Sequence, residues 1–259
     1  MSVRPKRSLG QHFLADRNVL GVIERLADLT SDDVVVEIGP GLGVLTTYLA
    51  ERVAYVHAIE LDRGLESRLA EAVGGRPNVA LRFEDAVGAD LGALAPTATK
   101  LVANLPYNVA TPIVVETLFG VPTVRTWCVM VQREVADRFF ASPGSKAYGA
   151  VSVHVRLHAR RTGFHPVART VFRPAPNVDS ALVAFERITP PARPGEVRRV
   201  VVAAFAHRRK TLANSLALAG VAPRDASVAA LESIGRSPAV RAEALEPDEF
   251  VSLTDALAR

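Results

Sequence analysis

Cysteine is almost absent from this sequence of 259 residues, in which Cys128 is the only one. A single cysteine excludes an internal disulfide framework and any zinc or iron–sulfur site built from several cysteines. It favours a reducing compartment, and we expect a cytoplasmic protein. No run of about 18 apolar residues occurs, so no transmembrane helix is expected. The basic segment Met1–Gln11 leads into no long apolar stretch, which argues against a secretory signal.

What the sequence does contain is an ordinary globular composition with an uneven charge. Hydrophobic residues make up 49% and charged residues 22%, which permits a sizeable core and excludes disorder for the bulk of the chain. Residues 1–124 hold 11 Lys and Arg against 15 Asp and Glu, a net charge of −4, whereas residues 125–259 hold 20 against 12, a net charge of +8. This asymmetry indicates a small-molecule site beside a site for a polyanion, with a solubilising surface as the alternative.

The first part of the chain alternates apolar strand patterns with helical ones. Strands are predicted at Val34–Ile38, Val56–Glu60, Val79–Phe83, Leu101–Asn104 and Thr126–Val131, and helices at Val44–Arg52, Gly64–Val73, Pro112–Phe119 and Glu134–Ala141. This rhythm predicts a Rossmann-like α/β fold, with a mostly parallel sheet covered by helices on both faces. The carboxyl ends of such strands meet at one edge, where ligands bind in open α/β sheets.

Strand patterns disappear after a proline-rich stretch, Thr189–Gly195, which is the best candidate for a linker. Beyond it the sequence predicts helices at Val197–Ala206, Thr211–Leu218, Asp225–Ile234 and Asp248–Leu257. We therefore expect an α/β domain over residues 1–188 and a small all-helical domain over residues 189–259.

A glycine-rich turn follows the first strand, with Gly39, Gly41 and Gly43 at alternate positions. Glycines allow a sharp turn and a close approach of a ligand to the backbone. Glu60 ends the second strand, where a carboxylate can accept both ribose hydroxyls of an adenosine cofactor. Asp85 ends the third strand and can accept from the adenine amino group. The pattern suits S-adenosylmethionine (SAM) better than NAD, because the dinucleotide motif needs a third glycine where this chain has Val44.

The fourth strand ends in Asn104-Leu105-Pro106-Tyr107, and this tetrapeptide indicates the chemistry. The exocyclic amino group of adenine is a poor nucleophile because its lone pair is delocalised into the ring. The side-chain oxygen of Asn104 and the Leu105 carbonyl can accept hydrogen bonds from both N–H groups and free that lone pair. Pro106 fixes φ and removes a competing donor, and the Tyr107 ring can stack on the base.

These motifs together make the chain similar to the rRNA adenine N6-dimethyltransferases, most of all to their bacterial small-subunit (16S) members. The resemblance runs from Lys6 to about Leu216 and includes Ser8–Leu14, Val36–Thr46, Ser145–Gly149, Val171–Ala181 and Ala204–Leu216. It implies SAM as cofactor, bound by His12, Leu14, Gly39, Gly41, Glu60, Asp85 and Asn104. It also implies catalytic positions at Asn104, Leu105, Pro106, Tyr107 and Phe172, the last as an aromatic ring against the target base.

The sequence departs from the family pattern at three of these places. His12 stands where the family often has Asn, which affects a side-chain contact to the cofactor. Ala175 interrupts the usual run of prolines, and Asn177 replaces a common Lys, so one phosphate contact is missing.

Basic residues near these motifs are candidates for contacts to an RNA backbone. They are Arg4, Lys6, Arg7, Arg160, Arg161, Arg173, Arg208, Arg209 and Lys210. The partner implied by the resemblance is small-subunit rRNA within a partly assembled small ribosomal subunit, and the protein is expected to be a monomer without membrane contact. No metal is expected, because His154 and His158 lack a third ligand at a suitable spacing.

The resemblance implies dimethylation of two adjacent adenosines in the 3′-terminal hairpin loop of small-subunit rRNA during subunit biogenesis. The alternatives are a large-subunit (23S) rRNA adenine methyltransferase of macrolide resistance and a ribosome-assembly or nucleic-acid-binding factor that retains the fold. A DNA adenine methyltransferase and an NAD dehydrogenase are more distant possibilities. Gly39–Gly43, Asn104–Tyr107 and Ser145–Gly149 favour the small-subunit enzyme.

Overall fold

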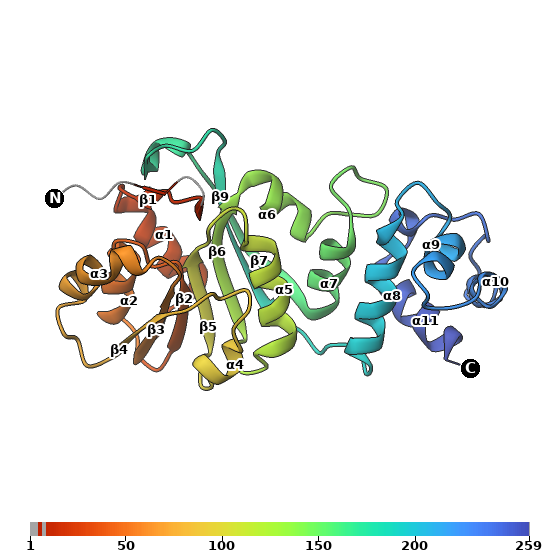
Figure 1. The fold of residues 1–259 in the computed structure, drawn as a ribbon, viewed down its shortest axis with the longest axis horizontal. Coiled ribbons are helices and arrows are strands. Elements are labelled where there is room, and N and C mark those ends of the chain that lie inside the picture. The colour runs from red at the N-terminus through yellow and green to blue at the C-terminus, as the bar shows by residue number, and fades with distance from the viewer. Residues whose placement is uncertain (1–4, 7–8, 259) are drawn as a thin grey trace. The chain divides into compact units, whose positions relative to one another are not determined.

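A seven-stranded sheet lies at the centre of the first part of the chain (Figure 1), in a computed structural model that describes residues 5–6 and 9–258. The spatial order is β4-β3-β2-β5-β6-β9-β7. The strands are β2 (Val34–Ile38), β3 (Tyr55–Glu60), β4 (Val79–Phe83), β5 (Lys100–Asn104), β6 (Thr126–Gln132), β7 (Ala159–Val167) and β9 (Ser180–Arg187). Strands β2 to β6 run parallel, and β9 is antiparallel to β6. The predicted α/β fold is confirmed.

The order of the strands reverses at β2, because β3 and β4 lie on one side of it and β5 lies on the other. It runs outward from β2 to β3 and β4, and then crosses back to β5, which pairs with β2. The loops after β2 and β5 therefore diverge, and this leaves a crevice at the carboxyl ends of these two strands.

The five parallel strands lie where the sequence predicts them. The bounds of β2 and β4 match, β3 and β5 begin one residue earlier than predicted, and β6 ends one residue later. The agreement has a physical reason: strands covered on both faces form nearly continuous apolar runs. Val35, Leu101 and Val129, for example, are fully buried.

Helices cover both faces of the sheet. They are α1 (Asn18–Ala27), α2 (Val44–Ala50), α3 (Glu66–Val73), α4 (Leu91–Leu94), α5 (Ala110–Gly120) and α6 (Arg133–Phe139). Successive side chains of a strand point to opposite faces of the sheet. Two neighbouring residues of β6 therefore contact helices on opposite faces. Cys128 belongs to the core cluster that contains Leu20 and Ile23 of α1, while the Trp127 indole donates to the Thr117 hydroxyl of α5 (2.9 Å). Helix α1 was not predicted from the sequence.

The sheet extends beyond the predicted strands. Strand β9 pairs with the whole length of β6, from Thr126 opposite Glu186 to Gln132 opposite Ser180. A separate two-stranded ribbon joins β1 (Phe13–Leu14) to β8 (Phe172–Arg173). Both pairings join segments that are far apart in the sequence, so a local pattern carries little information about them.

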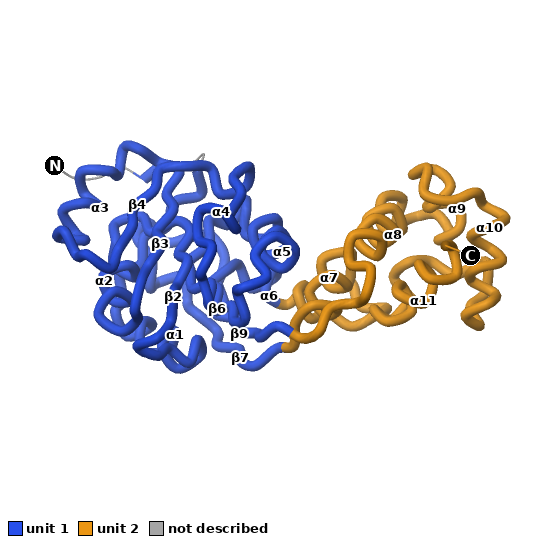
Figure 2. The backbone as a smooth tube through the Cα atoms, turned by 90° about the horizontal axis from the view of Figure 1, so that it is seen from below, with its two compact units in different colours: residues 1–136, 161–187 blue, residues 137–160, 188–259 orange. Residues whose placement is uncertain are grey.

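A second compact unit is helical and comprises residues 137–160 and 188–259 (Figure 2). Its helices are α7 (Ala150–His158), α8 (Pro194–Ala206), α9 (Leu212–Leu218), α10 (Arg224–Ser233) and α11 (Pro247–Leu257). Residues 137–160 were expected in the α/β domain but belong to this helical unit, and the predicted linker Thr189–Gly195 overlaps the start of α8. In the structure Tyr148 is buried in the core of the helical unit, and its hydroxyl donates to the Leu245 carbonyl (2.7 Å). Pro194 starts α8, a position at which proline is favoured.

None of the helices in the described part of the chain is long and apolar enough to cross a membrane. Across residues 5–6 and 9–258 there is also no group of three or more His, Cys, Asp or Glu side chains that could hold a metal ion.

Candidate active site

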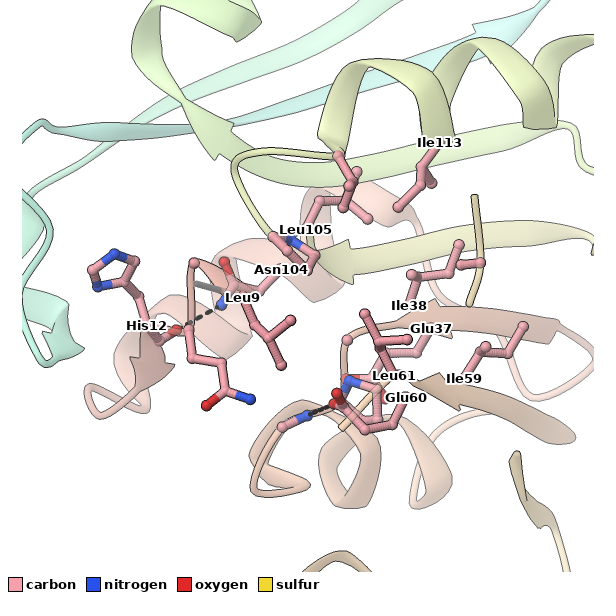
Figure 3. Close-up of a pocket in the computed structure, with 18 of the residues that line it drawn as sticks. Leu9, His12, Glu37, Ile38, Ile59, Glu60, Leu61, Asn104, Leu105 and Ile113 are labelled. Atoms are coloured by element: carbon pink, nitrogen blue, oxygen red, sulfur yellow. Dashed lines mark hydrogen bonds between the residues drawn. The ribbon is translucent and has the colours of Figure 1, made fainter. Parts of the chain in front are cut away.

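One pocket opens at the carboxyl ends of the parallel strands (Figure 3). The predicted site residues that line it are His12, Leu14, Gly39, Gly41, Glu60, Asp85, Asn104, Leu105, Pro106 and Tyr107. Figure 3 draws Glu60 and Leu61 on one side and Asn104 and His12 on another. The structure thus brings together every predicted cofactor and catalytic residue except Phe172.

The glycine turn after β2 packs so closely against neighbouring residues that a side chain at Gly39 or Gly41 would collide with them. Gly39 and Gly41 have φ angles of 74° and 59°, in the left-handed region that favours glycine. A Cβ atom on Gly39 would lie 3.2 Å from Pro106, and one on Gly41 would lie 3.0 Å from Phe13. The turn therefore presses against both the tetrapeptide after β5 and the N-terminal segment.

Glu60 is held by backbone amides at the end of β3. Its Oε2 accepts a hydrogen bond from the Gly41 amide (3.0 Å), and its Oε1 accepts one from the Asp62 amide (2.9 Å). The residue is buried, with 6% of its surface exposed. Each carboxylate oxygen keeps further acceptor capacity. The arrangement can fix a negative charge in the pocket and still receive two hydroxyl groups.

Two apolar residues near Glu60 and Asp85 also line the pocket and were not predicted from the sequence. Leu61 is 51% exposed and Val87 is 41% exposed, and both line the pocket. Asp85 also lines it, and its Oδ1 accepts from the Val87 amide (3.0 Å). Exposed apolar side chains next to a carboxylate are suited to a planar ring with a polar edge. Their position directly after Glu60 and just after Asp85 is the signal that could have identified them.

Glu37 is a second buried carboxylate on this side of the pocket and was not singled out from the sequence. It lies within β2, is 1% exposed, and its Oε2 has no hydrogen-bond partner among the described residues. Burial raises the pKa of Glu37 to about 8, and the nearby charge of Glu60 acts in the same direction. A carboxyl group inside the apolar run Val34–Ile38 was the available signal.

The amide of Asn104 has a defined orientation at the end of β5. Its Nδ2 donates to the His12 carbonyl (3.1 Å), so its Oδ1 is left to accept from a ligand. The next amide, of Leu105, donates to the Met130 carbonyl (3.1 Å), which ties the tetrapeptide to β6. The side-chain oxygen and the following backbone are thus set in place before any substrate arrives.

Tyr107 is fixed at its hydroxyl and on one face. The hydroxyl lies 2.5 Å from the Ser180 Oγ, and burial raises the pKa of the phenol, which stays neutral. The His12 ring stacks on it with a centroid distance of 5.4 Å and an interplanar angle of 29°. The His12 Nδ1 in turn donates to the Pro174 carbonyl (2.8 Å).

Phe172 is the predicted catalytic residue that this structure places elsewhere. It is completely buried in the core of the sheet, and it pairs with Leu14 in the β1–β8 ribbon. It does not line the pocket. The ring that accompanies Tyr107 here is that of His12, because the β1–β8 pairing turns Phe172 into the core.

The predicted RNA-binding residues that the structure describes are distributed over both compact units. Arg4 and Arg7 lie outside the described residues. Lys6 is bound to the buried Asp62, with 2.6 Å between Nζ and Oδ1. The exposed basic residues are Arg160 and Arg161 on β7, Arg173 on β8, and Arg208, Arg209 and Lys210. The last three lie in the turn before α9 rather than inside a helix.

Comparison with known proteins agrees with this geometry. Residues 3–258 match the family described as "Ribosomal RNA adenine dimethylase". A protein of Rubrobacter xylanophilus named "Ribosomal RNA small subunit methyltransferase A" is 46% identical over 252 residues, which cover 96% of this chain and 94% of the relative. A protein of Lactiplantibacillus plantarum with the same name is 44% identical, over 97% and 90% of the two chains.

Two solved structures are similar over almost the whole chain. A dimethyladenosine transferase from Plasmodium falciparum has a TM-score of 0.77 at 24% identity, over 93% of this chain and 96% of its own, and shows the shared fold. The 23S rRNA methyltransferase ErmE has a TM-score of 0.67 at 28% identity, over 95% and 100%. With a family match that spans residues 3–258, this chain belongs to the ribosomal RNA adenine dimethylase family.

Proposed function

We propose that this protein uses SAM to dimethylate N6 of two adjacent adenosines in the 3′-terminal hairpin loop of small-subunit (16S) rRNA. The family match and the near-full-length relatives named for the small subunit support the reaction and the substrate. The observation that carries the proposal is the fixed amide of Asn104, a residue of the pocket wall whose nitrogen donates to the His12 carbonyl and whose oxygen is left to accept. Such an acceptor suits an amino group.

The residues on the β2–β3 side of the pocket fit SAM. Glu60 has acceptor capacity for the ribose hydroxyls, and Asp85 offers a carboxylate to the adenine amino group. Leu61 and Val87 provide exposed apolar surface for the adenine ring. The glycine turn contributes Gly39, Pro40 and Gly41 to the wall of the pocket. When bound, SAM supplies an electrophilic methyl group on its sulfonium.

The residues after β5 supply the other half of the reaction. The Asn104 oxygen and the Leu105 carbonyl accept from the two N–H groups of the target adenine, which draws its lone pair out of conjugation. These acceptors stabilise the positive charge that develops on the nitrogen, so they act mainly in the transition state. The nitrogen then loses a proton to solvent, and no strong base is required.

The target base must leave its stack to reach this pocket. Flipping costs a few kcal/mol in a duplex and less in a loop. Stacking on an aromatic ring recovers about 1–3 kcal/mol per base. Tyr107 is the ring that the pocket presents for this purpose, with its hydroxyl held at Ser180.

The basic residues of the second half support binding to the phosphate backbone. The exposed turn Arg208–Lys210 and the exposed Arg160, Arg161 and Arg173 are the candidates that the structure describes. A footprint wider than one nucleotide favours a partly assembled small subunit over naked RNA as substrate. We propose that the protein acts on it as a cytoplasmic monomer without a bound metal.

The large-subunit enzymes are the nearest rival, because ErmE shares the fold at 28% identity. The relatives named for the small subunit are 44–46% identical over at least 96% of this chain, which favours the 16S substrate.

The deciding experiment is transfer of labelled methyl groups from SAM to unmethylated small and large subunits, followed by mass spectrometry of the nucleosides. We expect N6,N6-dimethyladenosine in small-subunit RNA. Monomethyladenosine alone, or modification confined to large-subunit RNA or to DNA, would contradict the proposal.

A further inference from the structure

Asp62 lies just beyond the ribose-binding end of β3 and binds the N-terminal part of the chain. Its Oδ1 is 2.6 Å from the Lys6 Nζ, and its Oδ2 accepts from the Gln11 Nε2 (2.9 Å). The Gln11 side chain also accepts from the Lys6 amide (2.8 Å), and the Leu9 amide donates to the Lys6 carbonyl (3.1 Å). We call Lys6 and Leu9–Gln11 the N-terminal strap. One carboxylate thus holds both described ends of the strap.

The same residue is fixed on the side of the sheet. The Asp62 amide donates to Glu60, and its Oδ1 accepts from the Gly64 amide (2.9 Å), which caps the short 3-10 turn Arg63–Leu65. Asp62 is 5% exposed. Burial opposes its charge, but the hydrogen bonds from Lys6, Gln11 and Gly64 outweigh this and lower the pKa of the carboxyl. It therefore remains an anion at neutral pH.

The N-terminal strap forms part of the pocket wall. Leu9, Gly10 and Gln11 line the pocket, and Figure 3 draws Leu9 between the Asn104 and Glu60 sides. The strap continues into His12, whose carbonyl receives the Asn104 amide. It is therefore anchored on the cofactor side by Asp62 and on the substrate side by Asn104.

We propose that Asp62 is a positioning residue that latches the N-terminal strap across the cofactor site and so controls how long SAM stays bound. The inference rests on the proposed function, since it takes SAM as the ligand of the pocket. It also gives a different role to Lys6, which was expected to contact RNA. Its ammonium group is engaged with Asp62 and closes the latch instead.

The central test is Asp62→Asn, which keeps an acceptor for the Gly64 amide but loses the charge and the acceptor for Gln11. We expect labelled SAM, chased with unlabelled SAM, to dissociate about 10-fold faster than from the parent protein, in line with the loss of one charge-assisted hydrogen bond. The value of kcat at saturating SAM should stay within about threefold, because the reacting groups are untouched.

A second variant restores the latch with reversed polarity. In Asp62→Asn combined with Gln11→Glu, the new amide can donate to the new carboxylate, which also still accepts from the Lys6 amide. SAM release should return to within about twofold of the parent rate. The matched control is Asp33→Asn, because Asp33 is also buried and paired with a lysine (Lys100, 2.9 Å) but does not line the pocket. It should leave SAM release unchanged.

Hydrogen exchange of the backbone amides of residues 9–12, measured without ligand, tests the latch independently of SAM. Asp62→Asn should speed up their exchange at least about fivefold, while Asp33→Asn should not. Parent-like SAM release and exchange in Asp62→Asn, an equal effect of Asp33→Asn, or no recovery in the double variant would each overturn the latch. If the parent protein binds no SAM, the proposed function fails, and the exchange experiment alone decides the latch.

Discussion

The two sides of the pocket are built in different ways. On the cofactor side, Glu60 is held by the Gly41 and Asp62 amides, and these three residues lie within about 20 positions of one another. On the substrate side, the contacts join distant segments: Asn104 to His12, Tyr107 to Ser180, and His12 to Pro174. The Glu60 carboxylate is thus positioned within one unit, β2–α2–β3, whereas the substrate half depends on contacts between distant segments.

This difference predicts how each side fails. Damage on the cofactor side should change SAM affinity and leave the intrinsic rate largely intact. Damage on the substrate side should change the rate and leave SAM affinity largely intact. The following variants break or sharpen this contrast.

Asn104→Ala should have the largest effect. Removing one pre-oriented group that stabilises a developing charge typically lowers kcat about 100- to 1000-fold. SAM affinity should change only a few-fold, because the cofactor contacts at Glu60 are untouched. Steady-state kinetics and calorimetry on the same preparation measure both quantities, with Asn78→Ala, outside the pocket, as the control. A variant that keeps kcat within a few-fold of the parent value would contradict the assigned role.

Glu37→Gln tests the buried carboxyl that lacks the amide donors of Glu60. The folded-state pKa of Glu37 is raised to about 8 from its ordinary value of 4.5, so the folded protein holds a proton that the unfolded chain releases. The stability this group contributes is fully present below about pH 4.5 and is lost as the pH rises to about 8. The loss reaches about 3 kcal/mol at pH 7 as an upper limit.

Glu37→Gln should therefore match the parent in stability near pH 4.5 and exceed it at pH 8. Urea unfolding across this range measures the difference, with Glu232→Gln on the exposed face of α10 as the control. If the stability of the parent and of Glu37→Gln depends on pH in the same way, the Glu37 carboxyl is not the source of the pH dependence.

Glu60→Ala should weaken SAM binding by about 1.5–3 kcal/mol, or roughly 10- to 150-fold, through lost charge-assisted hydrogen bonds. The variant also releases the Gly41 and Asp62 amides, so Glu60→Gln, which keeps one carbonyl acceptor, should lose less. Calorimetry measures the SAM affinity of the parent and of both variants. An unchanged affinity in Glu60→Ala, or tighter binding of NAD than of SAM by the parent, would refute the cofactor assignment.

The same contrast explains what the sequence could and could not predict. The parallel strands and the glycine turn are local patterns: residues 35–38 of β2 are all buried, and Gly39 and Gly41 precede a helix. Glu60 follows from its place at the end of the next strand. These features can be recognised within a window of about thirty residues.

The missed features depend on partners that no local pattern specifies. Strand β9 joins the parallel strands by pairing with β6, about fifty residues earlier in the chain. Phe172 is buried because β8 pairs with β1, and Lys6 pairs with an aspartate 56 positions away. The sequence pattern near the N-terminus indicated an RNA contact at Lys6 and gave no sign of its ion pair with Asp62.

The smallest expected effect concerns RNA and lies outside the pocket. Replacing Arg208, Arg209 and Lys210 by neutral residues should weaken RNA binding and flatten its salt dependence by about one unit of log–log slope per lost phosphate contact. Lys6→Met is the informative comparison, because its ammonium group is bound to Asp62 and should contribute little to the slope. Titrations of small-subunit RNA at several salt concentrations give both slopes. A parent-like slope in the triple variant, or a reduced slope in Lys6→Met, would move the RNA-binding surface from the helical unit towards the N-terminal strap.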